Sequence, residues 1–181
     1  MGSKQIMNET DMKNSLKRIT SEILECNQNN LSALALIGVK TRGEYLAKRI
    51  SHLLKKWEKL DLPVGSVDIT LYRDDFREVV ELPVAQATEI MFPVRGKHII
   101  LIDDVLFTGR TVRAAIDVII DFGRPKTIQL AVLVDIGNRE FPICPNYVGK
   151  SIQVEKSSFV EVKLKEIDGE DKVILFTPEG K

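Results

Sequence analysis

Hydrophobic and polar positions along the chain follow two different periods. Three stretches repeat apolar residues every three or four positions, which is typical of amphipathic helices, at about 11–26, 45–57 and 111–122. Thr10 or Asp11 can cap the first of them. Short apolar or alternating runs between the helices predict strands, at 34–37, 67–71, 99–102 and 128–134. Regular alternation of strands with helices is typical of a parallel α/β sheet.

Three further stretches depart from this alternation. Residues 73–95 form a long, charged excursion, and long loops in compact domains are often functional lids. Residues 135–158 have an irregular pattern, whereas 159–164 and 173–176 predict a C-terminal hairpin. We therefore predict one domain over 1–181: an α/β fold with an open, mostly parallel sheet, flanking helices, a flexible lid loop and a C-terminal hairpin.

Composition narrows the class of protein. A chain of 181 residues with 44% hydrophobic content can build one substantial core. Lys and Arg together number 26, as do Asp and Glu, so no global charge attracts the chain to nucleic acid or to a membrane. The two cysteines are too few for a disulfide framework or a zinc site. With no membrane-length apolar run in the sequence, we expect a cytoplasmic protein.

The segment 99–111 carries the clearest chemistry. Asp103 and Asp104 stand at the carboxyl end of an apolar strand, and Thr-Gly-Arg-Thr at 108–111 opens the next helix. Ligands of open α/β sheets bind beyond the carboxyl ends of the strands. A glycine turn at a helix N-terminus can bind phosphate through its backbone amides. We therefore expect a sugar phosphate here, with its hydroxyls and a metal at the carboxylates and its phosphate in the turn.

A second loop, 40–43, joins the first apolar strand to its helix. Its backbone amides, the Thr41 hydroxyl and the Arg42 guanidinium could bind a diphosphate. By itself a basic residue beside a glycine turn is more often an ordinary helix entry. The presence of 99–111 on another strand of the same predicted sheet favours the functional interpretation.

The acidic pair and the turn Thr-Gly-x-Thr resemble the signature of type I phosphoribosyltransferases, which bind 5-phosphoribosyl-1-pyrophosphate. The resemblance implies that the acidic pair holds the ribose hydroxyls, partly through Mg²⁺, and that the turn holds the 5-phosphate. A finer resemblance, to the pyrimidine operon attenuator/uracil phosphoribosyltransferase family, is carried by six segments in order, at 38–43, 68–75, 99–115, 122–125, 129–135 and 145–150. These segments include Asp-Ile-Thr-Leu-Tyr-Arg-Asp-Asp and Pro-Asn-Tyr-Val-Gly-Lys.

The family resemblance implies the type I phosphoribosyltransferase fold and the conversion of uracil and 5-phosphoribosyl-1-pyrophosphate to UMP and pyrophosphate. It implies catalytic roles for Asp103, Asp104 and Arg73, the first two also as Mg²⁺ ligands and Arg73 on a lid over about 73–95. The implied substrate-binding residues are Thr41, Arg42, Val105, Leu106, Phe107, Thr108, Gly109, Arg110, Thr111, Tyr147 and Val148. Tyr147 and Val148 would belong to a base-binding hood over about 135–158, although both equally fit an ordinary strand.

Two positions favour a pyrimidine over a purine. Purine enzymes of the hypoxanthine-guanine type place an Asp just before the Thr-Gly turn, where this chain has Phe107. They also carry a Lys beyond the next strand, where this chain has Asp135. A phosphoribosyltransferase for another base is an open alternative.

The resemblance further implies that a homodimer or higher homo-oligomer binds pyrimidine-operon leader RNA. Such binding needs Lys and Arg at the phosphates and polar groups at unstacked bases. The candidates in this chain are Lys17, Arg18 and Arg139. RNA-binding relatives commonly carry Arg or His where this chain has other residues, namely Cys26, Ile136, Asn138 and Cys144. A nucleotide-sensing RNA binder with little catalysis is a second alternative.

Overall fold

The computed structural model of the protein describes residues 2–70, 87–155 and 157–178. In chain order its elements are β1 (Gly2–Met7), α1 (Glu9–Cys26), the 3-10 helix η1 (Gln28–Ala33), β2 (Leu34–Val39), α2 (Arg42–Glu58), β3 (Val64–Val67), β4 (His98–Leu106), α3 (Arg110–Asp121), β5 (Thr127–Asp135), β6 (Tyr147–Ser151), β7 (Phe159–Lys163), α4 (Lys165–Asp168) and β8 (Lys172–Thr177).

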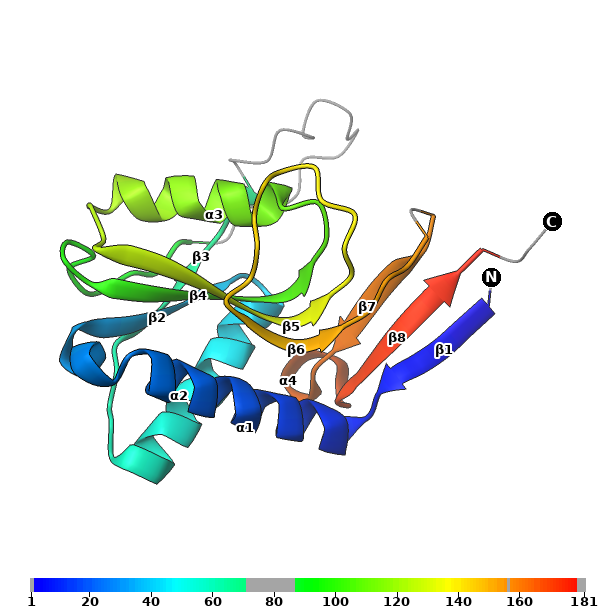
Figure 1. The fold of residues 1–181 in the computed structure, drawn as a ribbon, viewed down its shortest axis with the longest axis horizontal. Helices are drawn as coiled ribbons and strands as arrows, with labels where there is room; N and C mark the ends of the chain where they lie inside the picture. The colour runs from blue at the N-terminus through cyan, green and yellow to red at the C-terminus, as the bar shows by residue number, and fades with distance from the viewer. Residues whose placement is uncertain (1, 71–86, 156, 179–181) are drawn as a thin grey trace.

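Five strands form a wholly parallel sheet in the order β3-β2-β4-β5-β6. Helices α1 and α2 cover one face and α3 covers the other (Figure 1). Side chains of a strand alternate between its two faces. Accordingly, Ile100 and Ile102 of β4 pack in the core cluster with α1 and α2, whereas Ile99 and Leu101 pack with α3. The predicted α/β architecture with flanking helices is confirmed.

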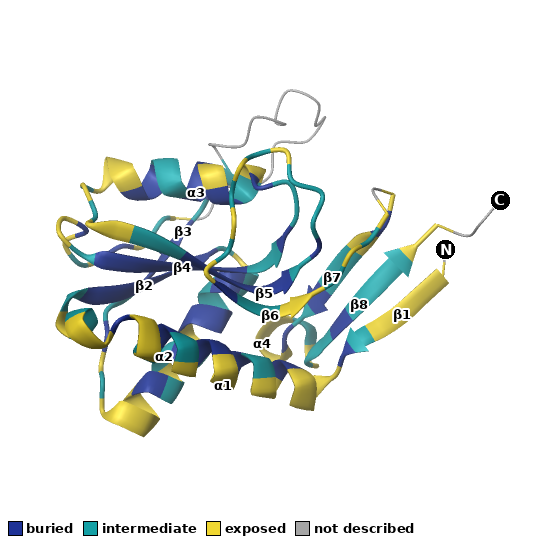
Figure 2. Cartoon of the chain, in the orientation of Figure 1, coloured by how far each residue is buried: buried dark blue, intermediate teal, exposed yellow. Residues whose placement is uncertain are grey.

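The central strands are apolar because both of their faces are covered. Every residue of β2 is buried, and so are the first six residues of β4. In Figure 2 the buried residues run through the middle of the sheet, while the exposed ones lie on the outer faces of the helices. The continuous apolar runs that predicted these strands are the expected signature of a doubly covered parallel sheet.

A second, antiparallel sheet has the order β1-β8-β7 and lies beside the large one (Figure 1). The predicted hairpin is confirmed as β7 and β8, with the short helix α4 between them. The sequence did not indicate β1, which pairs antiparallel with β8, Gly2 lying opposite Thr177. Four of the six β1 residues are exposed, so no buried periodicity marked this strand.

The start of α1 differs from the prediction. The cap is Asn8, whose Oδ1 accepts a hydrogen bond from the Asp11 backbone amide at 2.9 Å. The Asp11 carboxylate accepts in return from the Asn8 amide at 3.0 Å. Asp11 is therefore the third helical residue of a capping box rather than the cap, and Thr10 lies inside the helix.

Two strand predictions also need correction. The strand expected at 67–71 ends at Val67, because the Asp68 carboxylate accepts from the Thr70 amide at 2.8 Å and turns the backbone out of the sheet. The stretch 135–158 is not wholly irregular, since it contains β6, which pairs with β5 at the edge of the large sheet. Pro142, Pro145 and the exposed polar residues before β6 interrupt the hydrophobic pattern, so the sequence did not indicate this strand.

Candidate active site at the carboxyl edge of the parallel sheet

The loops that follow β2 and β4 leave the sheet side by side, because these two strands are adjacent and parallel. Helix α2 begins at Arg42 after the first loop, and α3 begins at Arg110 after the second. A Cβ atom on Gly43 would lie 2.4 Å from the Ile102 carbonyl oxygen. The first turn of α2 therefore lies directly against β4, immediately before Asp103.

Asp103 and Asp104 lie in the carboxyl-terminal half of β4, which extends beyond the predicted strand at 99–102 and ends at Leu106. The Asp104 backbone amide donates to Asp103 Oδ1 at 2.9 Å, and the Val105 amide donates to Asp104 Oδ1 at 2.9 Å. Asp103 is 5% exposed, whereas Asp104 is partly exposed. Backbone amides of the strand thus fix both carboxylates at the carboxyl ends of the parallel strands.

Burial governs the electrostatics of this pair. Desolvation, followed by repulsion from Asp104, raises the pKa of Asp103 well above its ordinary value. Desolvation also raises the pKa of Asp104, while hydrogen bonds and the positive charge of Arg42 favour its ionised form. Burial therefore favours the neutral, protonated form of this pair, and the ionised pair would need a positively charged partner.

The turn before α3 presents backbone donors. Gly109 has a φ of +91°, in the left-handed region that glycine adopts readily, and occupies the cap position of α3. The first-turn amides of α3 point toward this N-terminal end, where the helix dipole attracts anions, and Gly109 has no side chain that could cap them. Thr108 Oγ1 accepts from the Arg110 amide at 3.4 Å. This geometry suits a phosphate.

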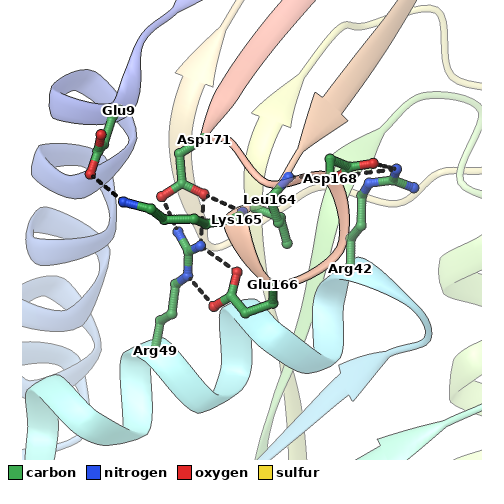
Figure 3. A network of polar contacts seen from close by, with 8 residues as sticks. All are labelled: Glu9, Arg42, Arg49, Leu164, Lys165, Glu166, Asp168 and Asp171. Atoms are coloured by element: carbon green, nitrogen blue, oxygen red, sulfur yellow. Dashed lines mark hydrogen bonds and ion pairs between the residues drawn. The ribbon is translucent and has the colours of Figure 1, made fainter.

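Arg42 connects the site to the small sheet. Its Nη2 donates to both carboxylate oxygens of Asp168 on α4, at 3.2 and 3.4 Å (Figure 3). Its Nε is buried and has no hydrogen-bond partner within the described chain. Thr41 precedes it as the cap of α2, after a cis peptide bond from Lys40. The structure thus brings the predicted diphosphate loop and the acidic pair together.

The loop after β5 lies over the turn before α3. The backbone amides of Glu140 and Phe141 both donate to the Thr108 carbonyl oxygen, at 2.9 and 3.0 Å. Arg139 ties the two loops together from inside. Its guanidinium donates to five acceptors, which are the carbonyl oxygens of Leu106, Phe107, Gly137 and Ile143 and the carboxylate of Asp135.

The predicted base-binding residues begin β6. The Tyr147 side chain is 3% exposed, and its hydroxyl contacts the side chains of Asn27 and Gln129 at 3.0 and 2.7 Å. Burial raises the pKa of this phenol to about 12. Val148 is partly buried in the core cluster on the α3 side of the sheet. The Tyr147 side chain is thus part of the core, and only backbone groups of this residue could contact a base.

Other predicted residues lie apart from this cluster. Arg73 lies outside the described residues, as does the predicted lid up to residue 86. Lys17 and Arg18 are exposed on α1. The Arg18 guanidinium donates to Glu22 Oε1 and to the Gly149 carbonyl oxygen of β6, at 3.0 and 2.6 Å.

Sequence reasoning missed two contributors to this site. Asp168 lies between the two predicted hairpin strands and had no predicted role, and Arg139 was predicted as an RNA contact rather than as a link between these loops. Both interactions join residues that are distant in sequence or hidden in an irregular loop. No spacing rule identifies such pairs, so only the folded structure reveals them.

The described residues include no group of three or more His, Cys, Asp or Glu side chains placed to hold a metal ion. Among the same residues, no helix is long and apolar enough to cross a membrane.

The fold and this site define a phosphoribosyl transferase domain, and the model of the phosphoribosyl transferase domain family matches residues 4–167. A solved structure supports the same fold. Hypoxanthine phosphoribosyltransferase of Trypanosoma cruzi is similar with a TM-score of 0.71 over 97% of each chain, at 16% sequence identity.

Much closer sequences narrow the family. The chain is 49% identical over 176 residues to the bifunctional protein PyrR of Thermus thermophilus, covering 97% of both sequences. It is 50% identical over 174 residues to the bifunctional protein PyrR of Deinococcus radiodurans, covering 96% of this chain and 94% of the relative. The chain therefore belongs to the PyrR family of phosphoribosyl transferase domains, which confirms the resemblance seen in its motifs.

Proposed function

We propose that this protein transfers the phosphoribosyl group of 5-phosphoribosyl-1-pyrophosphate to uracil, giving UMP and pyrophosphate. The observation that carries the proposal is the juxtaposition at one edge of the sheet of three parts. They are the acidic pair Asp103 and Asp104, the glycine turn at the start of α3 and the Arg42 loop. These parts match a ribose, a 5-phosphate and a diphosphate, respectively.

Each part has a distinct task in this reaction. Uracil N1 forms a bond to C1 of the ribose, while the C1–oxygen bond breaks and its electron pair leaves on pyrophosphate. The N1 proton passes to solvent. The carboxylates of Asp103 and Asp104 orient the ribose hydroxyls and stabilise the positive charge that develops at C1. The turn from Val105 to Thr111 holds the 5-phosphate, so that the ribose is fixed before the reaction.

The donor diphosphate is assigned to the Arg42 loop. Arg42 and the loop amides from Thr41 onward neutralise the negative charge on the leaving group. The positively charged Arg73 is assigned to the same task, although it lies outside the described residues. Uracil is assigned to the backbone of Tyr147 and Val148, at the edge of the sheet next to β5.

Mg²⁺ fits this donor set. Magnesium is commonly bound through one or two carboxylates, with the remaining ligands supplied by water and by substrate oxygens. Asp103 and Asp104 are adjacent on β4, and backbone amides fix both carboxylates at the carboxyl end of the sheet. When bound there, the ion would neutralise part of the negative charge of the diphosphate.

A substrate panel tests the proposed reaction. The purified protein is incubated with 5-phosphoribosyl-1-pyrophosphate, Mg²⁺ and each of uracil, orotate, adenine, guanine and hypoxanthine, and nucleotide formation is measured. We expect UMP formation from uracil, lost in Asp104→Asn by about 100-fold or more. Asp117→Asn, an exposed carboxylate on α3, is the matched control and retains activity. Turnover of another base instead of uracil would contradict the assignment.

We also propose that the protein regulates pyrimidine genes by UMP-dependent binding of leader RNA. The relatives are named bifunctional, which favours a second activity. The exposed side chains of Lys17 and Arg18 on α1 are the candidate phosphate contacts. The Arg139 guanidinium is engaged within its own loops, so we assign it a smaller part. A homodimer or higher homo-oligomer would multiply the few phosphate contacts of one copy.

Binding of a pyrimidine leader hairpin, measured with and without UMP over a range of salt concentrations, tests this second activity. We expect UMP to tighten binding and salt to weaken it, because phosphate contacts release counterions. Lys17→Glu should weaken binding without changing UMP formation. Absence of binding at low salt in the presence of UMP would remove the RNA role and leave the enzymatic one.

A further inference from the structure

We propose that Asp168 is a positioning residue for Arg42 and thereby sets the affinity of the site for a diphosphate. The inference rests on the proposed function, which assigns Arg42 to the diphosphate of the donor. Asp168 lies on α4, the short helix between β7 and β8 of the small sheet, 126 residues further along the chain than Arg42. Their ion pair is largely shielded, with 31% of the Arg42 side chain and 20% of the Asp168 side chain exposed.

The position of Arg42 is unfavourable for the helix itself. It is the first residue of α2, where the helix dipole repels a positive charge. An arginine there contributes nothing to helix capping, so its charge needs a compensating partner. Asp168 supplies the compensating negative charge at Nη2, at 3.2 and 3.4 Å.

One hydrogen-bond donor of Arg42 is left over. Among the described residues its Nε is buried without a partner, and an unpaired buried donor is costly. The missing acceptor would be a group that the described residues do not provide. An anionic ligand that approaches the loop after β2 is such an acceptor, because the loop amides and the guanidinium would act on it together.

Asp168 is itself held rigidly. Its Oδ2 accepts from the Leu164 backbone amide at 2.8 Å, which fixes the carboxylate at the start of α4. The rest of the segment is held by Arg49, about two helical turns further along α2 than Arg42 (Figure 3). Arg49 donates to Glu166 at 2.9 and 2.5 Å and to Asp171 at 2.9 and 2.7 Å.

This arrangement reduces the cost of binding. A free arginine side chain must lose its rotamer freedom when it binds a ligand, whereas Arg42 is already ordered by Asp168. Arginine at such a site contributes directional hydrogen bonds as well as charge, so its orientation affects affinity. Without Asp168, we expect weaker diphosphate binding and no change in the contacts of the 5-phosphate or the base.

The test compares ligands that contain a diphosphate with ligands that do not. In the full-length Asp168→Ala protein, we expect the KM for 5-phosphoribosyl-1-pyrophosphate and the dissociation constant of pyrophosphate to rise about tenfold. Affinities for UMP and uracil should stay within about twofold, because neither contains a diphosphate. Asp168→Asn is the second variant, for the case in which Asp168→Ala does not fold. It keeps an acceptor for the Leu164 amide, and the rise in the pyrophosphate dissociation constant should be smaller.

Asp171→Asn is the matched control, because it weakens the Arg49 clamp on the same segment and leaves the Arg42 contact in place. If the pyrophosphate dissociation constant rises as much in this control as in the Asp168 variants, and the melting temperatures are the same, Asp168 only stabilises the segment and the inference is wrong. Tighter pyrophosphate binding in Asp168→Ala or Asp168→Asn would mean that Asp168 competes with the ligand, and would also overturn the inference.

Calorimetry of pyrophosphate binding separates this inference from the proposed reaction. If the wild-type protein forms no UMP, the proposed function fails. If pyrophosphate affinity is unchanged in both Asp168 variants while the wild type forms UMP, the positioning role alone fails.

Discussion

Replacing Arg139 with methionine should loosen the loop that covers the turn before α3. Methionine keeps an unbranched apolar stem as far as the position of Nε and removes every hydrogen-bond donor. In the wild-type protein the guanidinium donates to three backbone carbonyls within 3.0 Å and to the Asp135 carboxylate at 2.6 Å. The two charged side chains are only 22% and 18% exposed, so water cannot easily replace these bonds.

The magnitude follows from counting the lost bonds. Each carbonyl contact contributes about 0.5–1.5 kcal/mol, and the charged contact contributes roughly 1.5–3 kcal/mol. The gross loss over three carbonyl contacts and one charged contact would be about 3–7.5 kcal/mol. The loop can open and expose its carbonyls to water, however, and this limits the loss to the cost of opening. We therefore expect the free energy of unfolding to fall by about 2–3 kcal/mol, which lowers the melting temperature by roughly 5–10 °C.

Two measurements check this prediction. Urea unfolding followed by circular dichroism gives the free energy of unfolding. Initial rates give the KM for uracil, which should rise because the predicted base-binding hood, to which this loop belongs, loses order. Glu140→Gln is the control, since it removes an exposed ion pair with Arg110 from the same loop and should cost less than about 1 kcal/mol. If Arg139→Met loses no more stability than Glu140→Gln, the reasoning from buried hydrogen bonds is refuted.

Three further outcomes are expected. Asp103→Asn should abolish UMP formation yet raise the melting temperature, measured by calorimetry, by a few degrees. Burial raises the pKa of this carboxyl and disfavours its charge, so a lower melting temperature would contradict the prediction. Gly43→Ala should destabilise the protein, since its Cβ would lie 2.4 Å from a carbonyl oxygen of β4, and unchanged urea unfolding would disprove the close contact. Hydrogen bonds from Arg49 lower the pKa values of Glu166 and Asp171. The difference in free energy of unfolding between wild type and Arg49→Met should therefore be largest above about pH 4.5 and shrink as the pH falls through those lowered pKa values, and a difference independent of pH would contradict this.

The parts of the site that could be predicted from the sequence are those encoded within one continuous segment. Residues 99–111 form a strand, an acidic pair, a glycine turn and a helix start in direct succession. Their order along one segment places these groups close together once the strand and the helix form. The loop with Thr41 and Arg42 was predictable for a related reason, because adjacent parallel strands bring their following loops to the same edge.

The unpredicted parts depend on contacts between distant segments. Strand β1 is defined only by pairing with β8, at the other end of the chain. The end of β3 depends on the Asp68 side chain, which competes with the sheet for the backbone. Tyr147 shows the same limit for a single side chain, since either a core position or a base contact fits its sequence and only the bonds to Asn27 and Gln129 decide.

The two arginines treated at greatest length illustrate why residue type alone does not assign a function. Arg139 and Arg42 both follow a buried strand and both lie near the proposed substrate site. The donors described for Arg139 are directed at protein acceptors, so its charge serves to hold two loops together. Among the described residues, Arg42 donates to the Asp168 carboxylate, and its buried Nε has no acceptor. Satisfied donors indicate a structural role, and a donor left unsatisfied at this edge of the sheet indicates a ligand.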